Sequence, residues 1–319
     1  MKKAFIIIAI ILVVLGSAIF FAAFASAGFD FKNLETSKLQ TKTYPVDADF
    51  QNIRIEEDTA DIVFALSEDG NCSVVCRETE KNVHRVTVED GTLKIVAEHM
   101  SGWRTWFSIS FENESVTVYL PKDAYETLAI ESHTGDVDLP EAFHFDSIAI
   151  TGSTGDVRCS ASASDLIAVR VDTGDILLDG VSANAIECTV TTGKIRMQSV
   201  TSQSYVSIGV STGRTILENL ACRELRSEGS TGEIRLSGVT AETILVERST
   251  GDVTFENSDA NEIRIETSTG DVAGSLRTGK IFVTKSTTGD VKVPESTAGG
   301  RCEITTTTGD IVVRIADEQ

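Results

Sequence analysis

A short motif recurs at a fixed interval along most of this 319-residue sequence. Thr-Gly, most often followed by Asp, returns in register every 19 to 20 residues, with its glycine at positions 135, 155, 174, 193, 213, 232, 251, 270, 289 and 309. A unit of that length cannot bury an apolar face by itself, so neighbouring units must stack to form a common core. The period therefore predicts a repeat architecture.

Each repeat alternates apolar and polar residues on both sides of its glycine. The position seven residues before the glycine is apolar in every copy: Leu128, Ile148, Ile167, Ile186, Val206, Leu225, Ile244, Ile263, Phe282 and Cys302. Nearly every copy is also apolar two residues after the glycine. Alternation with a period of two, in segments rich in Val, Ile and Thr, is typical of strands and not of helices. We expect two short strands per repeat, with these columns pointing inward.

These features predict an all-β fold, a single-stranded parallel β-solenoid (β-helix) of about ten coils of 19 to 20 residues. Each coil is a strand, a Thr-Gly-Asp corner, a second strand and a return turn. Consecutive coils are expected to pair in parallel about 4.8 Å apart, which gives a rod roughly 45 to 50 Å long.

The corner residues have a structural explanation. Glycine relieves the steric cost of a positive φ, and an aspartate carboxylate can accept hydrogen bonds from backbone amides of the turn. The three middle copies replace the aspartate with Lys194, Arg214 and Glu233. Because stacked carboxylates about 5 Å apart repel one another, we expect the two basic residues to relieve that repulsion.

The segment before the repeats also has β character. Residues 53–62 reproduce the repeat columns with Ala60 in place of glycine, and Asp90-Gly91 lies between two alternating runs, which predicts a hairpin. We divide the chain into a membrane segment, a tether, a β-rich N-terminal capping section and the solenoid, at residues 1–27, 28–45, 46–127 and 128–319.

The N-terminal segment is long enough to span a membrane. Residues 4–27 are uncharged, and a helix of that length crosses a hydrocarbon core of about 30 Å. Ala25-Ser26-Ala27 resembles a signal-peptidase site, so cleavage is the alternative, but the length of the apolar run favours an uncleaved anchor. Lysines flank the segment on both sides almost equally. We expect a single-pass protein of the cell membrane with an extracellular body, because the span lies where an export signal would lie.

The iterated corner carries a family resemblance. Ser/Thr-Thr-Gly-Asp-Val/Ile, repeated through residues 128–315, and the earlier strand Val116-Thr-Val-Tyr-Leu-Pro121 resemble the bacterial putative adhesin family called domain of unknown function 4097. The resemblance covers most of the chain after the membrane segment. It implies a β-solenoid at a bacterial envelope and brings no catalytic residues.

Residues with potential chemistry mostly occupy ordinary repeat positions. Gly209-Val-Ser-Thr-Gly213 matches the nucleophile elbow Gly-x-Ser-x-Gly, but that elbow needs a strand-to-helix turn and His and acidic partners. Ser211 instead occupies a corner position that holds serine in other copies. We interpret the histidines as surface residues without metal-ligand spacing: His84, His99, His133 and His144. We therefore predict no catalytic, cofactor-binding or metal-binding residue, no cofactor and no enzymatic activity.

The six cysteines include no Cys-x-x-Cys pair, and those in the repeats fill core or small-residue columns. We predict six free thiols, mostly buried: Cys72, Cys76, Cys159, Cys188, Cys222 and Cys302. Calcium binding by the aspartates is an open alternative to turn capping, although the nonapeptide of calcium-binding solenoids is absent. Trp103 and Trp106 offer a sugar-stacking surface as an alternative to burial in the capping section, which we favour.

The balance of 28 basic and 48 acidic residues gives a formal net charge of −20, which repels nucleic-acid phosphates. We expect a non-enzymatic, envelope-anchored rod that presents an extended acidic surface for adhesion or for binding an envelope protein or a glycan. One alternative is a sensory or regulatory component of an envelope stress system that docks another membrane protein. A polysaccharide-active β-helix enzyme has less support, because no acid and base cluster breaks the repeat.

Overall fold

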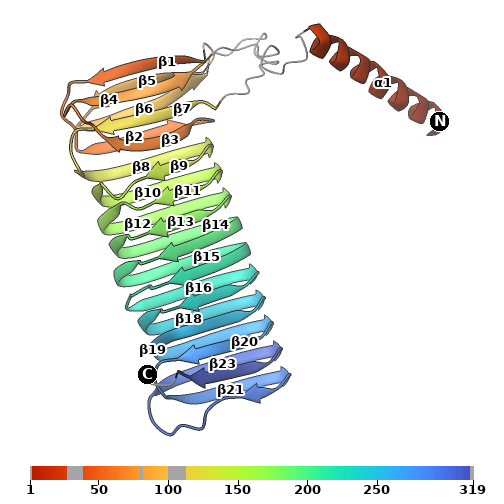
Figure 1. The fold of residues 1–319 in the computed structure, drawn as a ribbon, viewed down its shortest axis with the longest axis vertical. Helices are drawn as coiled ribbons and strands as arrows, with labels where there is room; N and C mark the ends of the chain where they lie inside the picture. The colour runs from red at the N-terminus through yellow and green to blue at the C-terminus, as the bar shows by residue number, and fades with distance from the viewer. Residues whose placement is uncertain (1, 27–38, 80–81, 100–112, 317–319) are drawn as a thin grey trace.

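The computed structural model describes residues 2–26, 39–79, 82–99 and 113–316 of the chain. Within them lies one helix, α1 (Lys2–Ser26), which is uncharged from Ala4 onward. Its segment Ala9–Ser26 has a mean hydropathy of 2.5 and is long enough to cross a bilayer, a property that signal sequences share. The remaining elements form one continuous sheet of 24 strands, coiled into a rod (Figure 1).

Most coils contain two strands, and some contain one long strand that continues through the corner. The strands of the repeats are β8 (Ala124–Thr134), β9 (Val137–Leu139), β10 (His144–Thr154), β11 (Val157–Cys159), β12 (Ser162–Thr173), β13 (Ile176–Asp179), β14 (Ser182–Gln198), β15 (Thr201–Glu218), β16 (Glu224–Thr231), β17 (Ile234–Ser237), β18 (Thr240–Thr250), β19 (Val253–Thr269), β20 (Val272–Leu276), β21 (Lys280–Thr288), β22 (Val291–Lys292), β23 (Gly300–Thr308) and β24 (Ile311–Ile315). Neighbouring coils pair in parallel and in register, as β10 does with β8 and with β12. The predicted parallel β-solenoid is confirmed.

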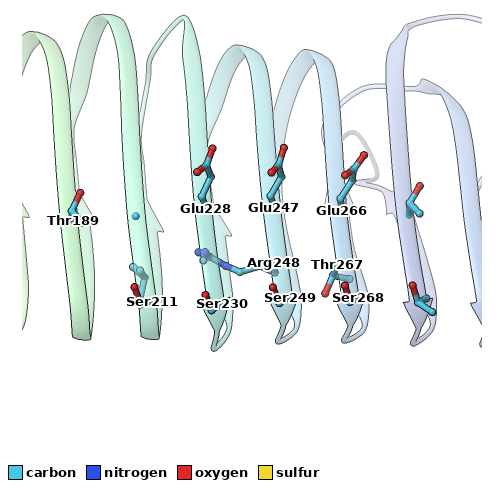
Figure 2. A pocket seen from close by; sticks show the side chains of 15 residues that line it. Thr189, Ser211, Glu228, Ser230, Glu247, Arg248, Ser249, Glu266, Thr267 and Ser268 are labelled. Atoms are coloured by element: carbon cyan, nitrogen blue, oxygen red, sulfur yellow. The ribbon is translucent and has the colours of Figure 1, made fainter.

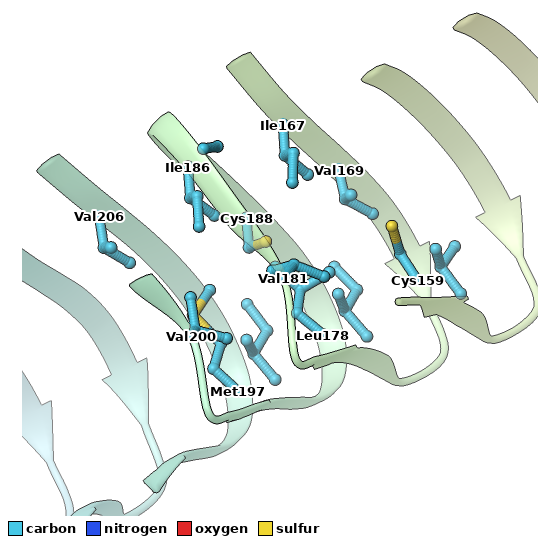
Figure 3. Packing of buried hydrophobic residues seen from close by; sticks show 14 of the residues in the cluster. Cys159, Ile167, Val169, Leu178, Val181, Ile186, Cys188, Met197, Val200 and Val206 are labelled. Carbon is cyan, nitrogen blue, oxygen red and sulfur yellow. The ribbon is translucent and has the colours of Figure 1, made fainter. Parts of the chain in front are cut away.

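The inward columns form the core. Ile167, Ile186 and Val206 occupy matching positions in three successive coils, and all three are fully buried (Figure 3). Cys188 continues a neighbouring column between Val169 of the coil before it and Ile208 of the coil after it. Because every coil presents the same columns, the buried side chains join into a single hydrophobic cluster along the rod.

The last coils do not stack in chain order. β23 pairs with β19 on one side and with β21 on the other, and β24 lies in the same way between β20 and β22. The coil that ends the chain is thus inserted between two coils that precede it in sequence. The expectation that consecutive coils always stack is wrong at this end.

The N-terminal end is interleaved in the same manner. Its strands are β1 (Gln40–Val46), β2 (Asn52–Glu57), β3 (Asp61–Leu66), β4 (Cys72–Glu78), β5 (Asn82–Glu89), β6 (Thr92–His99) and β7 (Ser115–Leu120). β2 lies between β6 and β8, and β3 lies between β7 and β9. The coil made of β2 and β3, which comes first in the chain, is therefore flanked on both sides.

Antiparallel strands cover the outer coil at this end. β5 pairs with β6 through the expected hairpin at Asp90-Gly91, where φ is 50° and 70°, while β4 pairs with β7 and β1 with β4. We expected residues 28–45 to form a tether, but Gln40–Val46 is strand β1 of this cap. The edge of β4 would otherwise be unpaired, so β1 belongs to the fold.

Candidate functional site

The repeat glycines stack directly on one another along the rod. At Gly213 φ is 146°, and a Cβ built there would lie 1.6 Å from the carbonyl oxygen of Gly193. The same distance separates a Cβ at Gly232 from the carbonyl oxygen of Gly213. Glycine is therefore required by the positive φ, as predicted, and also by the close contact between corners, which the sequence did not indicate.

The aspartate after each glycine links one coil to the next. Oδ1 of Asp136 accepts a hydrogen bond from the backbone N–H of Asp156 at 2.8 Å, and Oδ1 of Asp156 accepts one from Asp175 at 2.9 Å. Toward the far end of the rod, Oδ1 of Asp252 accepts the equivalent bond from Asp271 at 2.9 Å. The predicted bond to a backbone amide is present, but the amide belongs to the neighbouring coil and not to the same turn.

Basic side chains interrupt the row of carboxylates. Nζ of Lys194 lies 2.8 Å from Oδ2 of Asp175, and Arg158 lies 3.7 Å from Asp136 and 3.5 Å from Asp156. These pairs are partly exposed, so each contributes little to stability by itself. Their effect is to offset the repulsion between carboxylates on adjacent coils, as expected for Lys194.

A shallow groove of about 690 Å³ lies on the outward side of the strands just before the corners (Figure 2). One row of side chains in it consists of Glu228, Glu247 and Glu266, which occupy the same position in three successive coils. A second row consists of serines: Ser211, Ser230, Ser249 and Ser268. The groove therefore presents carboxylates and hydroxyls that repeat with the spacing of the coils.

Ser211 is one of these four equivalent serines and has no nucleophilic setting. Of the histidines whose side chains the structure describes, His144 contacts Ser164 at 2.9 Å and His133 contacts Asp58 at 3.4 Å. The third, His84, lies in the N-terminal cap. No described histidine is placed to activate Ser211, and the serine lies on a strand that continues through its corner, in β15.

One residue that lines the groove is a buried arginine (Figure 2). Arg248 occupies an inward position that is valine in three earlier coils and Gly229 and Thr267 in the two adjacent ones. Its Nη2 donates hydrogen bonds to Oγ1 of Thr215 at 3.0 Å and to Oγ of Ser227 at 2.9 Å. Within the described part of the chain its Nε and Nη1 have no hydrogen-bond partner. Burial lowers the pKa of Arg248 to about 10. Arg248 was not predicted from the sequence, although a charged side chain at an inward position was a visible signal.

A second buried polar cluster lies in the N-terminal cap. His84 Nδ1 is 2.8 Å from Oε2 of Glu78, and its Nε2 is 2.8 Å from Oε2 of Glu57. All three side chains are almost fully buried. The interpretation of His84 as a surface residue is therefore wrong: it connects β5 to β4 and β2. His133 and His144 are exposed, as expected, and the side chain of His99 lies outside the described residues.

Electrostatics favours the charged form of each member of this cluster. Burial opposes the imidazolium, but hydrogen bonds with Cys76 and Glu57 raise the pKa of His84 to about 11. Burial likewise opposes ionisation of Glu57, but His84 and the backbone amides of residues 58 and 60 hold its pKa below the usual value. Lys42 and Tyr44 of β1 contact Glu78, and the pKa of Glu78 is also lowered despite its burial. The cluster is a set of two carboxylates and two cations that ties four strands together, β1, β2, β4 and β5.

The same cluster contains donor atoms suited to a metal. Cys76, Glu78 and His84 each offer one ligand atom, and these atoms lie within 4.8 Å of one another. Both imidazole nitrogens of His84 already contact carboxylates, so a metal would have to displace a hydrogen bond and would find three protein ligands in a buried site. The arrangement fits a satisfied charge network better than a metal centre.

The cysteines and tryptophans singled out in the sequence have different outcomes. All six cysteines are free, and five are buried while Cys222 is partly buried, which confirms the prediction. Trp103 and Trp106 lie outside the described residues.

Comparison with protein families agrees with this architecture. The family model described as Toastrack DUF4097 matches residues 50–213 and 205–319, which together cover most of the chain. The chain belongs to the Toastrack DUF4097 family. The resemblance seen in the corner motif is thereby confirmed, and the family match begins just before β2 and leaves α1 outside. No curated protein matches the chain.

Several solved structures are similar to this chain at low identity. A putative adhesin from Parabacteroides distasonis is 14% identical, with 87% of this chain and 98% of that chain covered and a TM-score of 0.45. A putative lipid binding protein from the same species is 16% identical, with 74% and 96% covered and a TM-score of 0.48. A putative adhesin from Bacteroides fragilis is 17% identical, with 75% and 96% covered and a TM-score of 0.41.

Proposed function

We propose that this chain is a non-enzymatic rod, anchored in the cell membrane by α1, whose extracellular body presents an extended acidic surface for adhesion or for docking a partner. The observation that carries the proposal is the groove in which Glu228, Glu247 and Glu266 repeat in register beside a row of serines. A surface of this kind suits a long partner, because each coil offers the same pair of groups again.

The charge of the groove limits the partner. With a net charge of −20 on the chain, an anionic polymer such as a nucleic acid is repelled. Rows of carboxylates and hydroxyls suit hydrogen-bond donors and cations that recur along an extended molecule, as in a basic segment of an envelope protein or in a glycan. Because each contact is exposed and weak, useful affinity requires several coils to engage together.

The location is tested by adding protease to intact cells and reading the mature N-terminus of the protein by mass spectrometry. Digestion of the body from outside, with residues 1–27 retained, is the expected result. Protection of the body until the membrane is broken would place the rod inside the cell and remove the adhesive role. Loss of residues 1–27 would replace an anchored rod with a released one.

The groove is tested with a triple variant, Glu228→Gln, Glu247→Gln and Glu266→Gln, in a whole-cell adhesion or partner-capture assay. The matched control neutralises three exposed acids outside the groove, with Glu141→Gln, Asp146→Asn and Asp165→Asn. Both variants change the net charge equally, so a role of the groove predicts loss of binding only in the first. Equal loss in both would reduce the effect to overall charge, and no loss in either would exclude the groove.

A further inference from the structure

The end of the rod opposite to the cap presents open strand edges. The terminal coil there is formed by β21 and β22, and within the described chain β21 pairs only with β23 and β22 only with β24 (Figure 1). At the other end, β1, β4 and β5 cover the outer coil with antiparallel pairs. The two ends of the rod therefore differ: one ends in antiparallel strands, and the other exposes the side of a coil that normally receives a neighbour.

Backbone donors at this open end have lost the partners that their equivalents have. In earlier coils, the N–H of the repeat glycine donates to a threonine carbonyl of the next coil, as Gly251 does to Thr269 at 2.8 Å. The N–H two residues later donates to the next corner, as Val253 does to Asp271 at 2.9 Å. For Gly289 and Val291 no described coil follows. The carboxylate of Asp290 is likewise the last of the row that caps following amides, and its side chain is 77% exposed.

Apolar side chains gather at the same place. Ile281 is 45% exposed, Val283 is 47% exposed and Val291 is 42% exposed. Outside α1, only two other large hydrophobic residues of the described chain are exposed, Leu66 and Tyr119. Exposed apolar residues beside an unpaired edge are the usual signature of a surface that pairs with another chain.

The charge of this coil is balanced, in contrast to the rest of the molecule. Lys280 is buried and its Nζ lies 2.5 Å from Oδ1 of Asp259. The exposed charges on residues 280–299 are then two lysines and two acids: Lys285, Lys292, Asp290 and Glu295. Neither an anionic nor a cationic partner finds a surplus of opposite charge here. A patch that carries donors and acceptors, and both signs of charge, is what a symmetric contact with itself requires.

We propose that the open end, formed by β21 and β22, is a self-association surface at which a second copy of this chain docks tail to tail through antiparallel pairing of the open edges. The cap end of another copy offers no coil for the open end to continue, because its outermost described strands, β1 and β5, run antiparallel to their neighbours. A single extended strand from another protein would pair with only one of the two open strands, β21 or β22. Two rods meeting at their balanced ends also avoid the repulsion that their acidic sides would cause.

This arrangement deepens the proposed function, on which it rests. In each copy α1 precedes the capped end in the chain, so a tail-to-tail pair leaves a membrane anchor at both of its outer ends. Such a pair joins two opposing membranes and not two positions on one membrane. The class of partner for adhesion through this end is the same protein on a facing surface.

The test uses the full chain reconstituted at one copy per lipid nanodisc, with particle mass measured from nanomolar to micromolar concentration. Wild-type protein is expected to form complexes of two discs. Ile281→Glu introduces one carboxylate in each copy, so two negative charges meet at the contact. The variant is expected to weaken pairing by about tenfold or more. Leu66→Glu is the matched control, because Leu66 is also 45% exposed but lies in β3, near the capped end. It is expected to pair as wild type does.

Single discs at every concentration overturn this inference, and so does pairing that Ile281→Glu leaves unchanged. Either outcome would show that the open edges do not bind a second copy of this chain, and a strand from a different protein would then be their partner. Failure of tail-to-tail pairing can be told apart from failure of the proposed function. If the discs stay single while the groove variant still loses its partner on cells, only the self-association surface is wrong.

Discussion

A Cβ built on Gly229 would lie 1.9 Å from Nη1 of Arg248. The two residues occupy the same inward column in adjacent coils, so the space that the missing side chain leaves in one coil is filled by the guanidinium of the next. Thr215 and Ser227 supply the two oxygens that this guanidinium contacts. A polar site inside the rod is thus built from residues of three coils.

This complementarity predicts coupling between the two positions. Gly229→Ala forces the guanidinium aside and also approaches the carbonyl oxygen of Val210, so we expect a loss of about 1 to 3 kcal/mol in the free energy of unfolding. The loss should be smaller when Arg248→Ala is already present, because one of the two obstructing groups is gone. Urea denaturation of the four proteins of this double-mutant cycle measures the coupling. Additive effects would show that the guanidinium does not fill the space beside Gly229.

Corner glycines are expected to tolerate alanine far less than turn glycines do. Gly213→Ala meets both a positive φ and the carbonyl oxygen of Gly193, and should lower the free energy of unfolding by about 3 kcal/mol or more. Gly180 also has a positive φ, 69°, but nothing lies within 4 Å of its Cβ position. Gly180→Ala should therefore cost only about 1 to 2 kcal/mol. Thermal denaturation compares the two, and equal losses would mean that contact between corners is unimportant.

The aspartate row should act through its acceptor oxygen more than through its charge. Asp156→Ala leaves the backbone N–H of Asp175 without its acceptor, and we expect a loss of about 1 to 2 kcal/mol. Asp156→Asn keeps an oxygen at the same place and should recover most of that loss. Hydrogen exchange at the amide of Asp175 gives a second readout, with faster exchange in the alanine variant alone. If asparagine were as damaging as alanine, charge would be the dominant contribution.

The buried cluster around His84 should make stability depend on pH in two directions. The pKa of His84 is raised from 6.5 to about 11, so its stabilisation is complete below pH 6.5 and is lost as the pH rises toward 11. The pKa values of Glu57 and Glu78 are lowered from 4.5, so their stabilisation is complete above pH 4.5 and is lost as the pH falls. The cluster therefore contributes most to stability between pH 4.5 and pH 6.5.

His84→Gln tests this dependence by removing the cation while keeping a polar side chain. It leaves Glu57 and Glu78 buried with less compensation, so we expect a loss of about 3 to 5 kcal/mol near pH 5.5. The loss should shrink as the pH rises toward 11 and as it falls below 4.5. Denaturant titrations across that range measure the difference, and a loss that stays constant with pH would show that His84 acts by packing and not by charge.

The sequence contained most of the information about the repeats and much less about the ends. The period and the inward column, such as Ile167, Ile186 and Val206, predict the coil and its core, because each coil repeats the same local pattern. That same uniformity hides the order of the coils. Gly289 precedes Gly309 by 20 residues, an interval that sequential stacking would also give, so the spacing does not show which coil follows which.

The buried polar residues were missed for a different reason. Their neighbours come from distant strands, so no local pattern reveals their partners. Burial itself had a signal: Glu78 shares its face of β4 with Val74 and Cys76, and Arg248 shares its column with Val210. The groove followed from the repeat once the outward positions were aligned, because Glu247 and Glu266 lie at the same place in the motif.

The position of the final coil bears on how this protein is made. Because β23 and β24 lie between coils that are synthesised before them, the strands at 280–292 lack their docking partner until residues 300–315 have been translated. A nascent chain therefore cannot complete its C-terminal end progressively, one coil at a time. Termination near residue 299 would leave two mismatched coils with exposed edges, so the fold of residues 253–292 depends on a coil that is made after them.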